Sequence, residues 1–257
     1  MYKRQETDQN GSMTGESVEK LIRENEGVFA VVATTGTTNT GSIDHIEDIA
    51  NVCEKYNIWM HIDGAYGGAG ILAASVKHLY KGIERADSFI VDPHKWLFAP
   101  YDCCCLVYRS PDNVYQTFSQ HAEYLDGIDH SQTNPSDMAI HLSRRTRGLP
   151  LWYSLVTYGS KKYTEAVELC IENAKKCAEA IKNTEHLELI MEPTLSIVVF
   201  KRKGWDKQDY EKWSKELALK GELLCLPSSI DGETILRLAF LNPNTNIQKA
   251  IDIIIET

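Results

Sequence analysis

No uninterrupted apolar run in this sequence approaches the roughly 20 residues that a helix needs to cross a bilayer. The longest such runs, Val28–Ala33 and Ile197–Phe200, have the length of single strands. We therefore predict no membrane partner. Positive charge is also scarce, since 27 Lys and Arg stand against 36 Asp and Glu, for a net charge of −9. A chain this acidic is not expected to bind the phosphate backbone of nucleic acids.

A disulfide framework is not expected either. The seven cysteines are an odd number, and a chain of 257 residues can bury a core without cross-links. No charged segment followed by an apolar one opens the chain, so we predict reduced thiols and a cytoplasmic location. Three cysteines are consecutive, Cys103–Cys105, but along a strand their side chains would alternate between faces. We interpret them as packing residues and predict no metal site.

Helical and strand-like patterns alternate through the first part of the chain. Asp44–Tyr56 carries apolar residues at helical spacing. Val28–Thr34, Ile58–Ile62 and Ser88–Asp92 are apolar runs typical of strands, and the first is typical of a strand buried on both faces. This alternation predicts an α/β fold with a mostly parallel sheet over residues 1–149.

The second part of the chain has a different order of elements. A long helical pattern from Leu149 to about Asn183, with Gly159 as its weak point, precedes two strands, a helix, two strands and a last helix. This order predicts a smaller α+β domain over residues 150–257. Within the first part, residues 119–135 are polar and lack apolar periodicity, which indicates a mobile functional loop.

Two segments place ionisable side chains at the carboxyl ends of apolar strands, where open α/β sheets bind their ligands. Asp63 follows one strand, and Lys95 follows another. A carboxylate and an amine that reach one crevice suit pyridoxal phosphate, because the amine can condense with its aldehyde while the carboxylate pairs with its ring nitrogen. The residues alone leave an alternative open, in which Asp63 and Lys95 form a structural ion pair or are two exposed charges.

The same segments resemble the group II pyridoxal phosphate-dependent amino acid decarboxylases, which include the aromatic amino acid, glutamate and histidine enzymes. The likeness rests on Asp63-Gly-Ala65 and on Asp92-Pro-His94-Lys95-Trp96, where the lysine follows Asp63 by 32 residues. Further matching segments are Ala33–Asp44, Trp59–Asp63, Ser143–Arg145 and Leu236–Leu238. The resemblance implies the type I fold of pyridoxal phosphate-dependent transferases, with part of the large domain followed by the small domain.

The resemblance also implies a role for each matching residue. Lys95 would form the Schiff base with pyridoxal phosphate, and Asp63 would pair with the pyridine nitrogen. Ala65 would pack beneath the ring, Thr38 would contact the cofactor from a threonine-rich loop, and His94 would lie beside the imine. Two alternatives stay open, because Thr38 can bond only within its own loop and His94 can simply cap its turn.

Tyr124 lies in the polar loop, at the place where the family carries a tyrosine that returns a proton to the α-carbon. A phenol is a suitable proton donor, although an exposed loop tyrosine without catalytic duty is the alternative. His61 shares a strand face with Asp63 and is interpreted as a satisfied core histidine. Arg144, Arg145 and Arg147 either bind a carboxylate or form ion pairs across the domain boundary.

The activity that the resemblance implies is decarboxylation of an L-amino acid to its amine and carbon dioxide, with preference for an aromatic substrate. Complete family members have an upstream segment comparable in length to this chain, which carries the phosphate-binding turn and a ring-stacking histidine. We therefore expect a C-terminal fragment that binds pyridoxal phosphate weakly and belongs to a homodimer when full length. The alternatives are another fold type I enzyme, such as an aminotransferase or a different lyase, and an inactive folding or dimerisation module.

Overall fold

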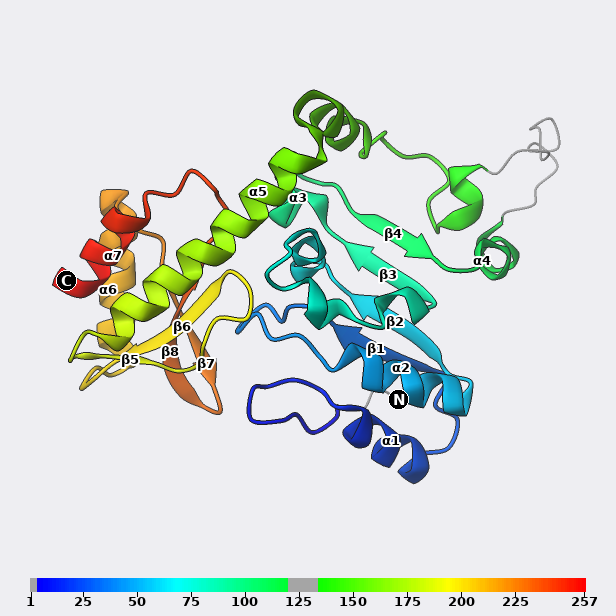
Figure 1. Cartoon of the computed structure of the whole chain (residues 1–257), viewed down its shortest axis with the longest axis horizontal. Coiled ribbons are helices and arrows are strands. Elements are labelled where there is room, and N and C mark those ends of the chain that lie inside the picture. Colours follow the sequence, from blue (N-terminus) through cyan, green and yellow to red (C-terminus); the bar gives the residue numbers. More distant parts are fainter. Residues whose placement is uncertain (1–3, 120–133) are drawn as a thin grey trace.

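The structure, a computed structural model, describes residues 4–119 and 134–257 (Figure 1). The elements before residue 120 are α1 (Gly15–Glu24), β1 (Ala30–Thr34), α2 (Ile46–Tyr56), β2 (Trp59–Asp63), η1 (Gly67–Leu72), η2 (Lys77–Tyr80), η3 (Ile83–Arg85), β3 (Ser88–Val91), α3 (Pro93–Trp96), β4 (Cys105–Tyr108) and α4 (Pro111–Phe118). The first sheet has the order β1-β2-β3-β4, in which β1, β2 and β3 are parallel and β4 is antiparallel to β3. This mostly parallel sheet with its helices confirms the predicted α/β class.

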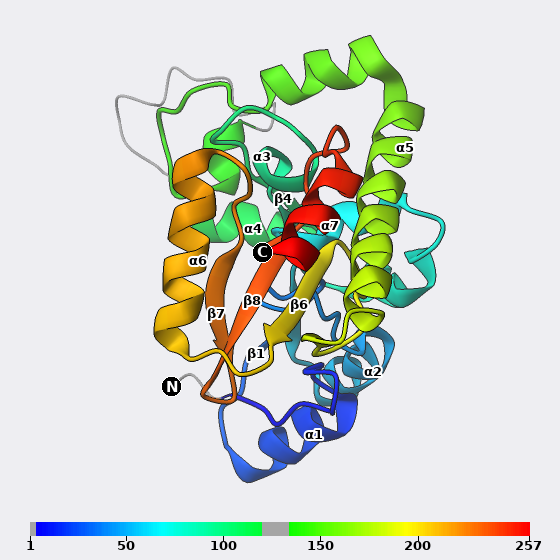
Figure 2. The ribbon, with the colours of Figure 1, turned by 90° about the vertical axis from the view of Figure 1, so that its left-hand side faces the viewer.

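A second sheet occupies the C-terminal part of the chain. The elements from residue 134 onward are η5 (Pro135–Met138), α5 (Leu149–Lys182), β5 (Leu187–Leu189), β6 (Ile197–Arg202), α6 (Lys207–Lys220), β7 (Leu226–Ile230), β8 (Glu233–Ala239) and α7 (Ile247–Glu256). The sheet order is β5-β6-β8-β7, and all its pairs are antiparallel. Figure 2 shows this sheet with α5, α6 and α7 around it.

Strand β6 is buried on both faces and joins two hydrophobic cores. Val198 and Phe200 face the core that α5, α6 and α7 form with the second sheet. Ile197 and Val199 point the other way, because side chains alternate along a strand, and belong to the core of the first sheet. The first core thus continues through α5 into the second sheet. The division into domains at residue 149 stays a prediction.

Two details of the sequence-based expectations can be compared with the structure. Helix α5 breaks at Gly159, whose φ of 75° lies outside the helical region, as the weak point of that pattern predicts. The expectation that the first strand is buried on both faces is wrong, because Val32 is 49% exposed whereas Val31 and Ala33 are buried. Among the helices of the two described ranges, none combines the length and the apolar composition that a membrane span requires.

Candidate functional site

The three parallel strands end side by side, and this brings the predicted site segments to one edge of the first sheet. Thr34 at the end of β1 pairs with Asp63 at the end of β2, and Asp63 pairs in turn with Ile90 of β3. The segments that follow parallel strands leave the sheet at the same edge. The loop with Thr38 follows β1, and the turn with Lys95 follows β3. The segments with Thr38, Asp63 and Lys95 therefore follow neighbouring strand ends, as the sequence predicts.

The glycine-rich stretch after β2 allows two of these segments to touch. A Cβ at Gly67 would lie 1.8 Å from the carbonyl oxygen of Thr35 and 2.8 Å from the Cα of Gly36. Only a hydrogen atom fits there, because both neighbours are backbone atoms. Glycine at this position therefore serves the close contact between the loop after β1 and the segment after β2.

Asp63 keeps one carboxylate oxygen available. Its side chain is half-buried, and its Oδ1 accepts the backbone N–H of Ala65 at 3.0 Å. The other oxygen, Oδ2, has no hydrogen-bond partner among the residues that the structure describes. The carbonyl oxygen of Ala65 accepts the backbone N–H of Asp92 at 3.0 Å, which ties the segment after β2 to the segment after β3. The arrangement offers a free carboxylate oxygen to an N–H donor at the sheet edge.

Lys95 lies on the single turn of α3, which begins with Pro93 after Asp92. Its Nζ is 2.9 Å from Oδ2 of Asp92, and its side chain is 40% exposed. Asp92, rather than Asp63, is thus the ion-pair partner of Lys95, so the alternative of an Asp63–Lys95 pair does not hold in this structure. The Asp92 carboxylate also interacts with the Cys104 thiol. Desolvation of that thiol, together with its hydrogen bond to Asp92, raises its pKa to about 11.

His94 is held by a backbone group. Its Nδ1 lies 2.6 Å from the carbonyl oxygen of Cys103 and 3.1 Å from the backbone nitrogen of the same residue. A protonated Nδ1 donates to the carbonyl, and an unprotonated one accepts the N–H, so the peptide orients the ring in either tautomer. The ring also contacts Tyr101 edge-on, with centroids 4.9 Å apart. The turn-capping alternative for His94 therefore has a structural basis, while Nε2 keeps no partner among the described residues.

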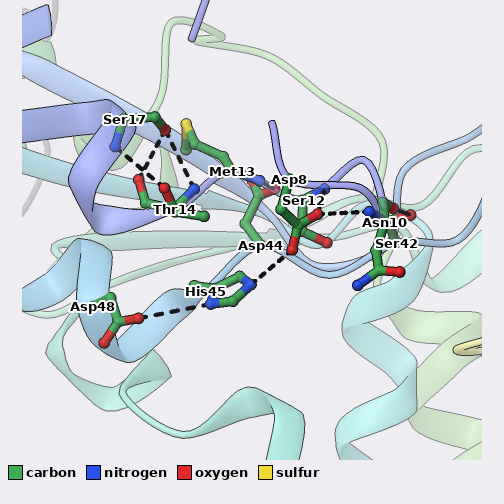
Figure 3. A network of polar contacts seen from close by, with 10 residues as sticks. All are labelled: Asp8, Asn10, Ser12, Met13, Thr14, Ser17, Ser42, Asp44, His45 and Asp48. Carbon is green, nitrogen blue, oxygen red and sulfur yellow. Dashed lines mark hydrogen bonds and ion pairs between the residues drawn. The ribbon is translucent and has the colours of Figure 1, made fainter. Parts of the chain in front are cut away.

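The threonine-rich loop is closed at its base by Asp44, which Figure 3 shows in its polar network. The Asp44 carboxylate accepts the backbone N–H groups of Thr34 and Met13, each at 2.7 Å. Burial raises the pKa of Asp44, although these two hydrogen bonds oppose the effect. At the other end of the loop Thr38 is exposed, and its carbonyl oxygen accepts from Arg237 Nε at 2.6 Å.

Arg237 is the residue that sequence reasoning did not assign to the site. It lies on β8 and is 199 positions from Thr38 in the chain. Its guanidinium is half-buried, and this desolvation lowers its pKa. The matching segment Leu236–Leu238 was the available signal, but the sequence alone did not connect that segment with the loop.

The other residues that the sequence singled out are a loop tyrosine, a strand histidine and three arginines. Tyr124 lies outside the described residues. His61 Nδ1 is 2.7 Å from Ser88 Oγ and the residue is half-buried, in agreement with a core histidine whose polar atom is satisfied. Arg145 and Arg147 both pair with Asp102. Within residues 4–119 and 134–257 no group of three or more His, Cys, Asp or Glu is arranged to hold a metal ion.

The geometry defines a class: an α/β protein that carries a carboxylate and a lysine amine after neighbouring parallel strands, at one edge of a mostly parallel sheet. The family description "Pyridoxal-dependent decarboxylase conserved domain" matches residues 2–203. The chain belongs to this family.

Individual proteins of known name show the same likeness. Aromatic-L-amino-acid decarboxylase of Bacillus atrophaeus is 29% identical, over 98% of this chain and 55% of its own length. Phenylacetaldehyde synthase of Petunia hybrida is 34% identical, over 74% of this chain and 39% of its own. The crystal structure of Oryza sativa TDC with PLP and tryptamine has a TM-score of 0.87 at 24% identity, over 95% of this chain and 54% of that one, which shows a shared fold. The chain thus spans about half the length of such relatives, or less.

Proposed function

We propose that this chain carries the lysine and the aspartate of a pyridoxal phosphate-dependent decarboxylase that converts an L-amino acid, by preference an aromatic one, into its amine and carbon dioxide. The observation that carries the proposal is the position of Asp63 and Lys95 after neighbouring strands, in segments that the hydrogen bond from the Asp92 N–H to the Ala65 carbonyl oxygen joins. The names of the relatives support both the reaction and the aromatic substrate.

The residues present fit pyridoxal phosphate. When bound, this cofactor supplies an aldehyde for covalent attachment and a ring that accepts electrons from the substrate's α-carbon. The free Oδ2 of Asp63 would accept a hydrogen bond from the protonated ring nitrogen, and Lys95, which pairs with Asp92 in this structure, would supply the amine for covalent attachment. By the resemblance, Ala65 would pack beneath the ring and Thr38 would contact the cofactor's polar groups. His94 would contact the cofactor through Nε2, because the backbone of Cys103 occupies its Nδ1.

Two further residues complete the proposal. The Arg237 guanidinium makes a single described hydrogen bond, through Nε, so its remaining N–H groups are suited to an anionic group such as the substrate's α-carboxylate. Tyr124 is the proposed proton donor to the α-carbon, by the resemblance alone.

Reductive labelling tests the cofactor proposal. The chain is incubated with pyridoxal phosphate and borohydride, and modified lysines are identified by peptide mass spectrometry. We expect the label on Lys95 and its loss in Lys95→Ala. Lys81→Ala is the matched control, because Lys81 also has an exposed side chain paired with a carboxylate, that of Glu47 at 2.8 Å. Equal labelling of Lys81 and Lys95 in the wild-type chain would indicate nonspecific amine reactivity and refute the proposal.

Formation of an aldehyde in place of the amine, with dioxygen and water consumed and carbon dioxide, ammonia and hydrogen peroxide released, is the second candidate function. A 34% identical relative named as an aldehyde synthase supports it, whereas a tyrosine at position 124 favours the amine. Product analysis of the full-length protein with an aromatic amino acid separates the two. We expect amine from the natural sequence and an aldehyde from Tyr124→Phe; unchanged amine formation in this variant would contradict the role of Tyr124.

We also infer a homodimer for the full-length protein and a cytoplasmic location. Large apolar side chains are exposed on the first turns of α5, including Trp152, Val156 and Tyr158 at 58%, 64% and 65% exposure, and such a surface suits a second copy of the chain. Light scattering that finds only monomers at high concentration would oppose this inference. The location is supported by the seven cysteines, which are all free thiols.

A further inference from the structure

The tip of the threonine-rich loop is fastened to the C-terminal sheet. Asn39 uses both ends of its carboxamide: Nδ2 donates to the carbonyl oxygen of Ser229 at 2.9 Å, and Oδ1 accepts from Ser228 Oγ at 2.6 Å. The neighbouring carbonyl of Thr38 accepts from Arg237. Strands β7 and β8 therefore hold two residues of a loop that belongs to the edge of the other sheet.

Away from the tip, Ser42 Oγ donates to the carbonyl oxygen of Asn10 at 2.7 Å, and further hydrogen bonds join residues of the loop to one another. The N–H groups of Gly36 and Thr37 donate to the carbonyl of Ser42 at 3.1 and 2.9 Å, and the N–H of Gly41 donates to the carbonyl of Thr37 at 2.8 Å. These bonds close the loop on itself without placing its tip relative to Lys95. Among the described residues, every hydrogen bond that leaves the tip goes to β7 or β8.

We propose that Asn39 is a positioning residue, through which the C-terminal sheet sets the place of Thr38 and thereby the affinity for pyridoxal phosphate. This inference rests on the proposed function. An amide is required, because the side chain must accept from Ser228 and donate to the carbonyl of Ser229. A carboxylate keeps only the first bond and places its charge against a carbonyl oxygen. A tip that is already held in place spares the cofactor the entropy of ordering it, which raises affinity.

The experiment compares Asn39→Ala, Asn39→Asp and Ser228→Ala with the unchanged 257-residue chain. The first readout is hydrogen exchange of the backbone amides of residues 36–42. The second is the pyridoxal phosphate concentration that gives half-maximal borohydride trapping on Lys95. Asn183→Ala is the matched control, because Asn183 Nδ2 also makes two hydrogen bonds, to the carbonyl oxygen and side chain of a single residue at the end of α5.

For Asn39→Ala we expect exchange about tenfold faster and half-saturation at an about tenfold higher concentration, since both side-chain bonds are lost. Asn39→Asp and Ser228→Ala each lose one bond and should show smaller effects in the same direction. The Asn183→Ala control should leave both readouts unchanged. Unchanged exchange in Asn39→Ala overturns the inference.

Faster exchange with an unchanged half-saturation also overturns it, because the bonds would then have only a structural role. A wild-type chain that takes no label on Lys95 overturns the proposed function and this inference together. Normal wild-type labelling without an effect of Asn39→Ala overturns the inference alone. The two failures are therefore distinguishable.

Discussion

Tyr66→Phe tests how the C-terminal part of the chain supports the site. The Tyr66 hydroxyl lies 2.6 Å from Ser196 Oγ and accepts the N–H of Ser196 at 3.1 Å. Both residues are buried, and burial raises the pKa of Tyr66 far above its ordinary value. The Tyr66 ring stacks on Trp96, the residue after Lys95, with centroids 5.2 Å apart. One buried hydroxyl thus connects the segment before β6 with the two site segments.

Removal of this hydroxyl leaves two buried groups of Ser196, Oγ and the backbone N–H, without a partner. An unpaired buried polar group costs about 1–3 kcal/mol, so with two such groups Tyr66→Phe should lower the free energy of unfolding by about 2–6 kcal/mol. Equilibrium urea denaturation followed by circular dichroism measures the loss. The double variant Tyr66→Phe/Ser196→Ala leaves only the N–H unpaired, so it should lose less than the sum of the single variants. A loss below about 0.5 kcal/mol in Tyr66→Phe would refute the reasoning.

Two further predictions concern backbone contact and pH. Gly67→Ala should lower the free energy of unfolding by more than about 3 kcal/mol in the same urea assay, because its Cβ would lie 1.8 Å from the Thr35 carbonyl oxygen. In the control Gly148→Ala the new Cβ has no neighbour within 4 Å, so the free energy of unfolding should stay within about 0.5 kcal/mol of wild type. Similar stability of the two variants would contradict this prediction. Desolvation lowers the pKa of His61 from its ordinary 6.5 in the folded state, so the unfolded chain binds more protons and stability is lost as the pH falls below 6.5. His61→Gln should remove this component, and parallel stability–pH curves for the variant and the wild type would contradict it.

Most elements of the first sheet follow from local patterns in the sequence. The apolar runs that end at Asp63 and before Lys95 are strands, and their parallel pairing follows from the helices between them. The local pattern did not reveal which faces of the strands would be covered. Val32, which lies in one of the apolar runs, is half-exposed. A run of apolar residues reports a strand, whereas burial depends on what packs against it.

The residue types of the candidate site could also be predicted from the sequence. An aspartate after one strand and a lysine after the next are readable as residue types at set positions, and the segment around Lys95 is specific enough to indicate the family. The sequence did not predict the ion-pair partner of Lys95. The amine pairs with Asp92, three residues earlier, and this choice depends on the direction of one helical turn.

Residue types and short-range periodicity in the chain were thus sufficient for the fold class, the two key side chains and the family. The attachment of the threonine-rich loop to β7 and β8 became visible only in three dimensions. Asn39 and Thr38 meet their partners across 190 and 199 positions of sequence, and no periodic signal spans such a separation. Contacts of this kind arise when two sheets pack on one core, because the packing, and not the local pattern, places the loop tip beside Arg237.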